Sequence, residues 1–77
     1  MTADNFDQTL NGLLDRAPFR PFTVVLLRGR RFEVDYPKAL VARNGIAVYI
    51  SPGGAPIIFD HEGVEHFVAD LSGQGTP

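Results

Sequence analysis

The 77-residue sequence predicts a mainly β, α+β fold, in which an N-terminal helix precedes a five-stranded antiparallel sheet closed into a small barrel. An apolar stripe with helical spacing opens the chain, short runs rich in β-branched and aromatic residues follow, and glycine and proline turn signals separate them. We therefore expect a single domain over residues 1–71, followed by a small, polar, disordered tail over residues 72–77.

The first element is predicted to be an amphipathic helix over residues 3–16. Its apolar side chains fall at i, i+4, i+7 and i+8 on one stripe, formed by Phe6, Leu10, Leu13 and Leu14. Thr2 is the expected N-cap, and Arg16 lies where the helix dipole favours a cation. Pro18 ends the helix, because the residue before a proline is pushed out of the α-helical region.

Strand-like composition follows in short segments. Gly29 supplies the positive φ of a tight hairpin, Pro37 starts a single helical turn, and Asn44-Gly45 is the strongest hairpin signal in the chain. A barrel of about five strands is expected from the segments 22–28, 31–36, 40–43, 46–50, 56–60 and 64–70.

These strands are too rich in valine, leucine and isoleucine to form an isolated sheet with one solvent-facing side. Closing them into a barrel buries that surface and limits the exposed edges. An SH3-like or Sm-like barrel is the simplest architecture, and an open α+β sheet with the helix packed across it is the alternative.

The net charge of −2 hides a division along the chain. Residues 1–15 carry three aspartates and no base, residues 16–43 carry all seven basic residues against two acidic ones, and residues 44–77 carry four acidic residues and no base. Either these segments lie side by side and neutralise one another, or the middle one forms a basic patch for nucleic acid or an acidic partner.

Reactive groups are scarce. There is no cysteine, and Ser51 and Ser72 lie in a glycine-proline loop and in the tail with no partner indicated by spacing. His61 and His66 are five residues apart, so they do not share the helical face that a zinc-protease motif needs. We predict a protein that is not an enzyme and that has no metal or cofactor.

The first ten residues lack the basic and apolar regions of a signal peptide, and the longest apolar run, Val24 to Leu27, is too short to span a bilayer. We expect a soluble, cytoplasmic protein that does not bind membranes.

The expected functional surface is basic. It combines the tip of the first hairpin with two further basic residues and one aromatic side chain, expected to be exposed, that could stack a nucleobase: Arg28, Arg30, Arg31, Lys38, Arg43 and Tyr49. An apolar strand face left over by the barrel, formed by Thr23, Val25 and Leu27, favours self-association.

Two resemblances follow from these motifs. The stretch Pro18-Phe19-Arg20-Pro21-Phe22, with Gly29-Arg30 and Phe32-Glu33-Val34 after it, resembles a family of small bacterial proteins that share a PFRPF opening and a GRxFEV hairpin, for which no function is established.

The order of elements is similar to that of Sm-like proteins such as the RNA chaperone Hfq, with Phe22, Val24, Leu26 and Gly29 matching their first motif and Phe59 and His61 their last. Val34 replaces a glycine of that pattern, and Asp60 replaces the lysine beside its RNA-contacting histidine.

Together, these observations predict a non-enzymatic protein–protein interaction module that self-associates or docks on another protein, with no small-molecule substrate. The alternative is an Sm-like RNA-binding protein that uses the basic hairpin tip.

Overall fold

The computed structural model describes residues 1–69, which form one helix and six antiparallel strands. The helix is α1 (Ala3–Leu14), and short 3₁₀ turns, η1 (Leu27–Gly29) and η2 (Pro37–Ala39), follow β1 and β2. The strands are β1 (Phe22–Leu26), β2 (Arg31–Val34), β3 (Leu40–Arg43), β4 (Ile46–Ile50), β5 (Pro56–Asp60) and β6 (Val64–Ala69). The expected tail over 72–77 and the last residue of the 64–70 strand lie outside the described residues.

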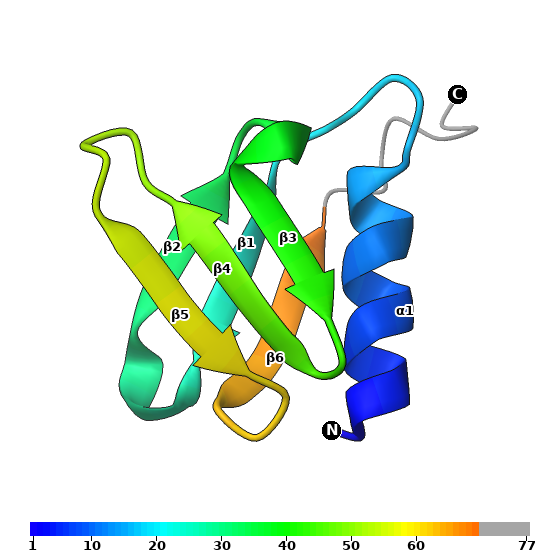
Figure 1. Ribbon diagram of the computed structural model, residues 1–77, viewed down its shortest axis with the longest axis vertical. Coiled ribbons are helices and arrows are strands. Elements are labelled where there is room, and N and C mark those ends of the chain that lie inside the picture. Colours follow the sequence, from blue (N-terminus) through cyan, green and yellow to red (C-terminus); the bar gives the residue numbers. More distant parts are fainter. Residues whose placement is uncertain (70–77) are drawn as a thin grey trace.

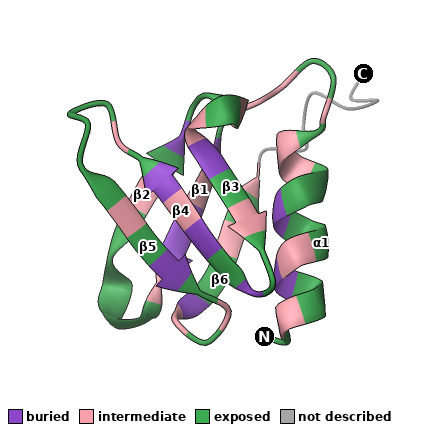
Figure 2. Ribbon diagram, in the orientation of Figure 1, coloured by how far each residue is buried: buried purple, intermediate pink, exposed green. Residues whose placement is uncertain are grey.

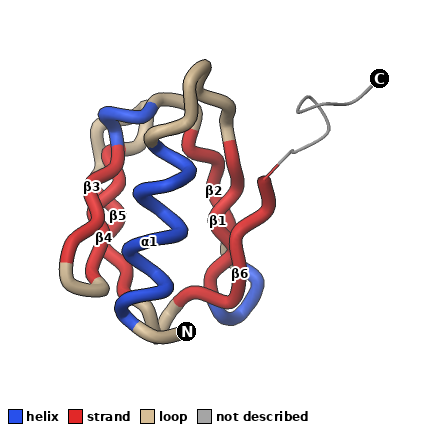
Figure 3. Tube along the Cα trace, turned by 90° about the vertical axis from the view of Figure 1, so that its right-hand side faces the viewer, coloured by secondary structure: helices blue, strands red, loops and turns tan. Residues whose placement is uncertain are grey.

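The strands make two three-stranded sheets, with the orders β2-β1-β6 and β3-β4-β5. No ladder joins the sheets within residues 1–69, so the expected five-stranded closed barrel is not formed. The chain passes from the first sheet to the second between β2 and β3. Pro37 lies there and starts η2, and because it lacks an amide hydrogen it cannot donate a hydrogen bond to a neighbouring strand. On another side, α1 stands between the two sheets (Figures 1 and 3).

The helix begins as expected and ends two residues early. Thr2 is the N-cap, and its side chain accepts a hydrogen bond from the amide of Asn5 at 3.1 Å. The helix stops at Leu14 with Asp15 as its C-cap, so Arg16 lies beyond it and not in its last turn. The strands predicted over 22–28 and 31–36 are also shorter, since η1 occupies the end of the first and β2 stops at Val34.

Both predicted glycine turns have the expected backbone conformation. Asn44 and Gly45 have φ values of 56° and 80°, as a two-residue hairpin turn requires. At the first hairpin, Gly29 has a φ of 81°, and its neighbour Arg28 also lies in the left-handed region with a φ of 70°.

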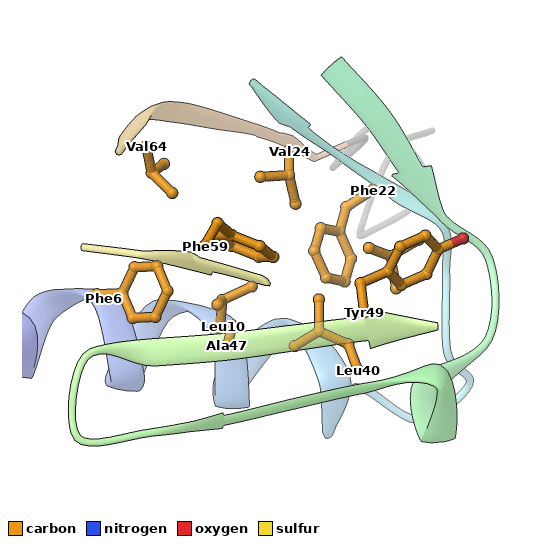
Figure 4. Close-up of a cluster of buried hydrophobic side chains, with 10 residues drawn as sticks. Phe6, Leu10, Phe22, Val24, Leu40, Ala47, Tyr49, Phe59 and Val64 are labelled. Carbon is orange, nitrogen blue, oxygen red and sulfur yellow. The ribbon is translucent and has the colours of Figure 1, made fainter. Parts of the chain in front are cut away.

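Aromatic side chains connect the helix and both sheets. Phe6 of α1 lies edge-on to Phe59 of β5 with ring centroids 5.8 Å apart, and Phe59 lies 5.4 Å from Phe32 of β2. Phe32 in turn stacks on Tyr49 of β4 at 4.9 Å. These contacts belong to a core that fills the space between the sheets (Figure 4) and comprises Phe6, Leu10, Phe22, Val24, Val34, Leu40, Ala47, Tyr49, Phe59 and Val64.

The apolar face expected to be left over on β1 is largely covered. Val25 is 2% exposed, and its ladder partners on either side are Arg31 of β2 and His66 of β6. Only Leu27, at the end of the hairpin, remains exposed. The apolar surface from which self-association was expected is therefore smaller than predicted. In the described part of the chain, no helix is long and apolar enough to cross a membrane.

Candidate functional site

The second sheet has one side in the core and one side that faces solvent, which we call the outer face. The ladder registers align its residues in rows across the three strands. One row holds Val41, Val48 and Ile58, the next holds Arg43, Ile46 and Asp60, and a third holds Ile50 and Pro56.

The outer face carries several exposed apolar side chains next to one another. Ile58 is 70% exposed, Val41 is 67% exposed and Ile46 is 52% exposed. Figure 2 shows the three strands from this side, where more exposed residues alternate with more buried ones along each strand. Scattered apolar residues are normal on surfaces, but a contiguous apolar patch marks an interaction site.

The solvent-facing side of the first sheet provides the contrast. The edge strands there carry Arg31 and Glu33 on β2 and His66 on β6, with Val68 as the one exposed large apolar residue of the three strands. Such polar side chains keep an exposed sheet from associating. Their scarcity on the outer face of the second sheet is therefore a property of that sheet and not of the whole surface.

An open groove of about 550 Å³ adjoins the outer face where it meets the tip of the β1–β2 hairpin. Apolar side chains from both parts line it together with two arginines and one aspartate: Leu26, Leu27, Arg28, Arg30, Ile46, Ile58, Phe59, Asp60 and Gly63. The groove combines apolar surface with guanidinium groups at one end of the sheet.

Hydrogen bonds hold the hairpin tip beside the β5–β6 turn. The Leu26 amide donates to the Arg30 carbonyl at 2.7 Å, and the Leu27 amide donates to the Gly63 carbonyl at 2.9 Å. Within the β5–β6 turn, Oδ1 of Asp60 accepts from the amide of Gly63 at 2.9 Å. Backbone hydrogen bonds therefore hold the part of the hairpin that carries the groove arginines against the β5–β6 turn.

A second set of contacts, at the same end of the strands, holds the β3–β4 turn against α1. The Gly45 amide donates to Oδ1 of Asp7 at 2.9 Å, and the Gly45 carbonyl accepts from the His61 amide at 2.8 Å. The ring Nδ1 of His61 lies 2.9 Å from the Met1 carbonyl oxygen. These contacts connect the β3–β4 turn, the β5–β6 turn and the start of the helix.

The charged side chains near the groove form no ion pairs in the part of the chain that the structure describes. Within residues 1–69, the only ion pair closer than 4.0 Å joins His66 to Glu65 at 3.2 Å. The expected mutual neutralisation of the acidic and basic segments therefore does not occur through direct arginine or lysine pairs in this part of the chain.

The predicted basic surface is divided between distant parts of the molecule. Arg28 and Arg30 line the groove, and Arg43 lies on the outer face opposite Ile46. Arg31 lies on β2 beside Val25, in the other sheet. Lys38 lies in η2, at the end of the molecule opposite the hairpin tip (Figure 1).

Tyr49 is not the exposed aromatic that the sequence suggested. It is 2% exposed, and its hydroxyl donates to the Glu33 carbonyl at 2.9 Å. Burial raises the pKa of this hydroxyl above its ordinary value of 10.0, and the carboxylates of Asp35 and Glu33 raise it further. The prediction failed because β4 alternates, and the Tyr49 side of the strand faces the core.

The apolar residues of the outer face were missed by sequence reasoning. The runs IAVYI and PIIFD of β4 and β5 are apolar at successive positions, which indicates apolar side chains on both faces of a strand. This signal could have identified Ile46 and Ile58.

In residues 1–69, no three histidine, cysteine, aspartate or glutamate side chains come together as metal ligands would.

The outer face and the groove can bury apolar surface and pair with anionic groups of a partner. No protein-family model matches the chain, and no curated protein or solved structure shows significant similarity to it.

Proposed function

We propose that the chain is a non-enzymatic protein–protein interaction module that binds its partner through the outer face and the adjoining groove. The observation that carries the proposal is the row formed by Val41, Val48 and Ile58, whose two end residues are 67% and 70% exposed. Each square ångström of apolar surface removed from water contributes about 25 cal/mol, so this row favours a complex.

The groove arginines add specificity to the apolar contact. Arginine is enriched among the residues that dominate binding energies, and exposed charges at the rim of an interface raise the association rate. Arg28 and Arg30 stand beside Leu27 and Ile58 in the groove. This surface favours a partner that presents apolar side chains with carboxylates next to them.

The test is capture of a partner by tagged protein, with and without nuclease, using Ile58→Lys and a matched control. Val68 is 49% exposed on the edge strand β6 of the other sheet, so Val68→Lys makes the same change away from the outer face. We expect nuclease-resistant capture by the wild type and by Val68→Lys, and its loss in Ile58→Lys. Equal capture by all three proteins would refute the outer face as the docking surface.

RNA binding is the second candidate function. Arg28, Arg30 and Arg31 support it, because all three are exposed at one hairpin and make no ion pair within residues 1–69. If they bind phosphates, affinity for single-stranded RNA falls steeply with salt and falls further in the triple alanine variant. Undetectable binding at low salt would exclude this function, which lacks the stacking contribution that was expected from Tyr49.

The proposed relationship to SH3-like and Sm-like barrels concerns topology. β2 and β3 are consecutive, lie in different sheets and are separated only by residues 35–39. Strands that switch sheets through a bend make the corners of such folds. We interpret β2 and β3 as the two halves of one bent strand, which would make the fold an open five-stranded barrel of this type.

A further inference from the structure

The charged residues of the outer face lie at opposite edges of the sheet and at the same height along it. Arg43 is on the edge strand β3, Asp60 is on the edge strand β5, and both are ladder partners of Ile46 on the central strand. They do not form an ion pair with each other within the chain. Oδ1 of Asp60 is bonded to the Glu62 and Gly63 amides, and Oδ2 has no hydrogen-bond partner in residues 1–69.

We propose that the outer face binds a second copy of this chain in a two-fold dimer whose axis runs along β4. The proposal rests on the proposed function and names the partner. A two-fold rotation about an axis parallel to β4 places β5 of the second copy over β3 and keeps each row at its own height. Arg43 then faces Asp60 of the second copy, and the symmetry repeats this contact at the other edge.

The same rotation matches the apolar residues. Val41 faces Ile58 of the second copy, while Val48 and Ile46 meet their own counterparts near the axis. Two sheets that stack in this way bring their inner side chains together at an angle of about 30° between strands, as in β-sandwiches. A rotation about an axis perpendicular to the strands would reverse the rows and would not bring Arg43 to Asp60. The charges therefore select one arrangement.

The size of the face indicates which class of interface the dimer belongs to. Three strands spaced about 4.8 Å apart and about five residues long, at about 3.4 Å per residue, give a footprint of roughly 250 Å² on each copy. The total of roughly 500 Å² is below the 1,200 Å² or so of stable complexes, so the dimer belongs to the weak, transient class. We expect association only at high protein concentration, with a dissociation constant on the order of 10 µM to 1 mM, as weak complexes have.

Sedimentation of the purified full chain tests the proposal, over concentrations from about 10 µM to above 1 mM. The 8.4 kDa monomer is expected to give way to a dimer as concentration rises. Ile58→Lys should prevent this, and Val68→Lys should not. A wild-type chain that stays monomeric at the highest concentration, or a dimer that Ile58→Lys leaves unchanged, would overturn the proposal.

Charge variants test the direction of the axis. Arg43→Glu places a carboxylate opposite Asp60 of the second copy at both edges, so we expect the dimer to weaken about tenfold at low salt and to recover partly at high salt. Arg31→Glu makes the same change of net charge on the other sheet and should have little effect. If both variants weaken the dimer equally, the proposed axis is wrong.

A double-mutant cycle measures the contact itself. Asp60→Asn keeps an oxygen for the turn amides but removes the charge, so it should weaken the wild-type dimer and strengthen the Arg43→Glu dimer. Additive effects would show that the two residues do not meet across the axis. The two proposals can also fail separately: a strict monomer that still captures a partner through Ile58 would retain the interaction module and remove the dimer.

Discussion

Gly45 lies where the β3–β4 turn, the β5–β6 turn and the start of α1 meet, and its substitution by alanine should destabilise the fold strongly. A Cβ atom at this position would lie 2.8 Å from Cδ2 of His61 and 2.9 Å from Cβ of Ala3. The residue also has a φ of 80°, which only glycine adopts at little cost. The hydrogen bond that the Gly45 amide donates to Oδ1 of Asp7 depends on the same close approach.

The expected decrease in the free energy of unfolding has two contributions. Placing a residue with a Cβ in the left-handed region costs about 1–2 kcal/mol, and forcing an extra methyl group into a packed site costs about 1–3 kcal/mol. Gly45→Ala should therefore lower the free energy of unfolding by about 2–5 kcal/mol. A 77-residue domain has only roughly 4–12 kcal/mol in total, and each kcal/mol shifts Tm by about 4–8 °C.

Urea and thermal unfolding followed by circular dichroism measure this loss, with Gly12→Ala as the matched control. Gly12 lies within α1, and a methyl group added there would meet no neighbouring atom within 4 Å, so alanine should stabilise the protein by about 0.5–1 kcal/mol. If Gly45→Ala costs less than about 1 kcal/mol, the helix is not packed against the two turns as described.

Two further substitutions test single residues near the site. The buried Tyr49 hydroxyl has a raised pKa, so the unfolded chain loses this proton at lower pH than the folded one, and the free energy of unfolding should fall as pH rises above 10.0. Tyr49→Phe should remove this part of the decrease of the free energy of unfolding with pH, whereas Tyr36→Phe, at an exposed position, should not. An unchanged pH dependence in Tyr49→Phe would show that the Tyr49 hydroxyl does not cause the decrease. Arg28→Gly should stabilise the fold by about 1 kcal/mol, because it relieves a left-handed arginine. Arg30→Gly removes the same charge at an ordinary φ of −67° and should not stabilise; equal effects of the two in urea unfolding would show that Arg28 is not strained.

The local elements were predictable because their determinants are local. Thr2 caps the helix through its own side chain, and Asn44-Gly45 sets its turn through two positive φ values. The segments 40–43, 46–50 and 56–60 match the observed strands, since glycine and proline mark their ends. The helix end was placed two residues late because Pro18 limits a helix from a distance and does not fix its last residue.

The arrangement of the strands could not be predicted in the same way. Sheet closure depends on contacts between residues far apart in the chain, and here α1 covers the opening between the two sheets where strands of a closed barrel would pair. The prediction of one basic surface was wrong for the same reason. Arg30 lines the groove, whereas its neighbour Arg31 lies on β2 beside Val25, and Lys38 lies at the far end. Counting charges along the chain gives the net charge of each segment but not where each charged group lies in the folded structure.

Strand formation alone does not account for the outer face. Threonine has the branched shape that favours β-strands and is also compatible with water, yet the second sheet contains none. Its solvent-facing positions are instead valine, isoleucine and proline, except for Arg43 and Asp60. Exposed β-branched side chains on a sheet with free edges carry a risk of aggregation, which the charged first sheet avoids. Since neither core packing nor strand propensity requires these residues, we propose a binding surface to account for both the apolar rows and the two opposite charges at their edges.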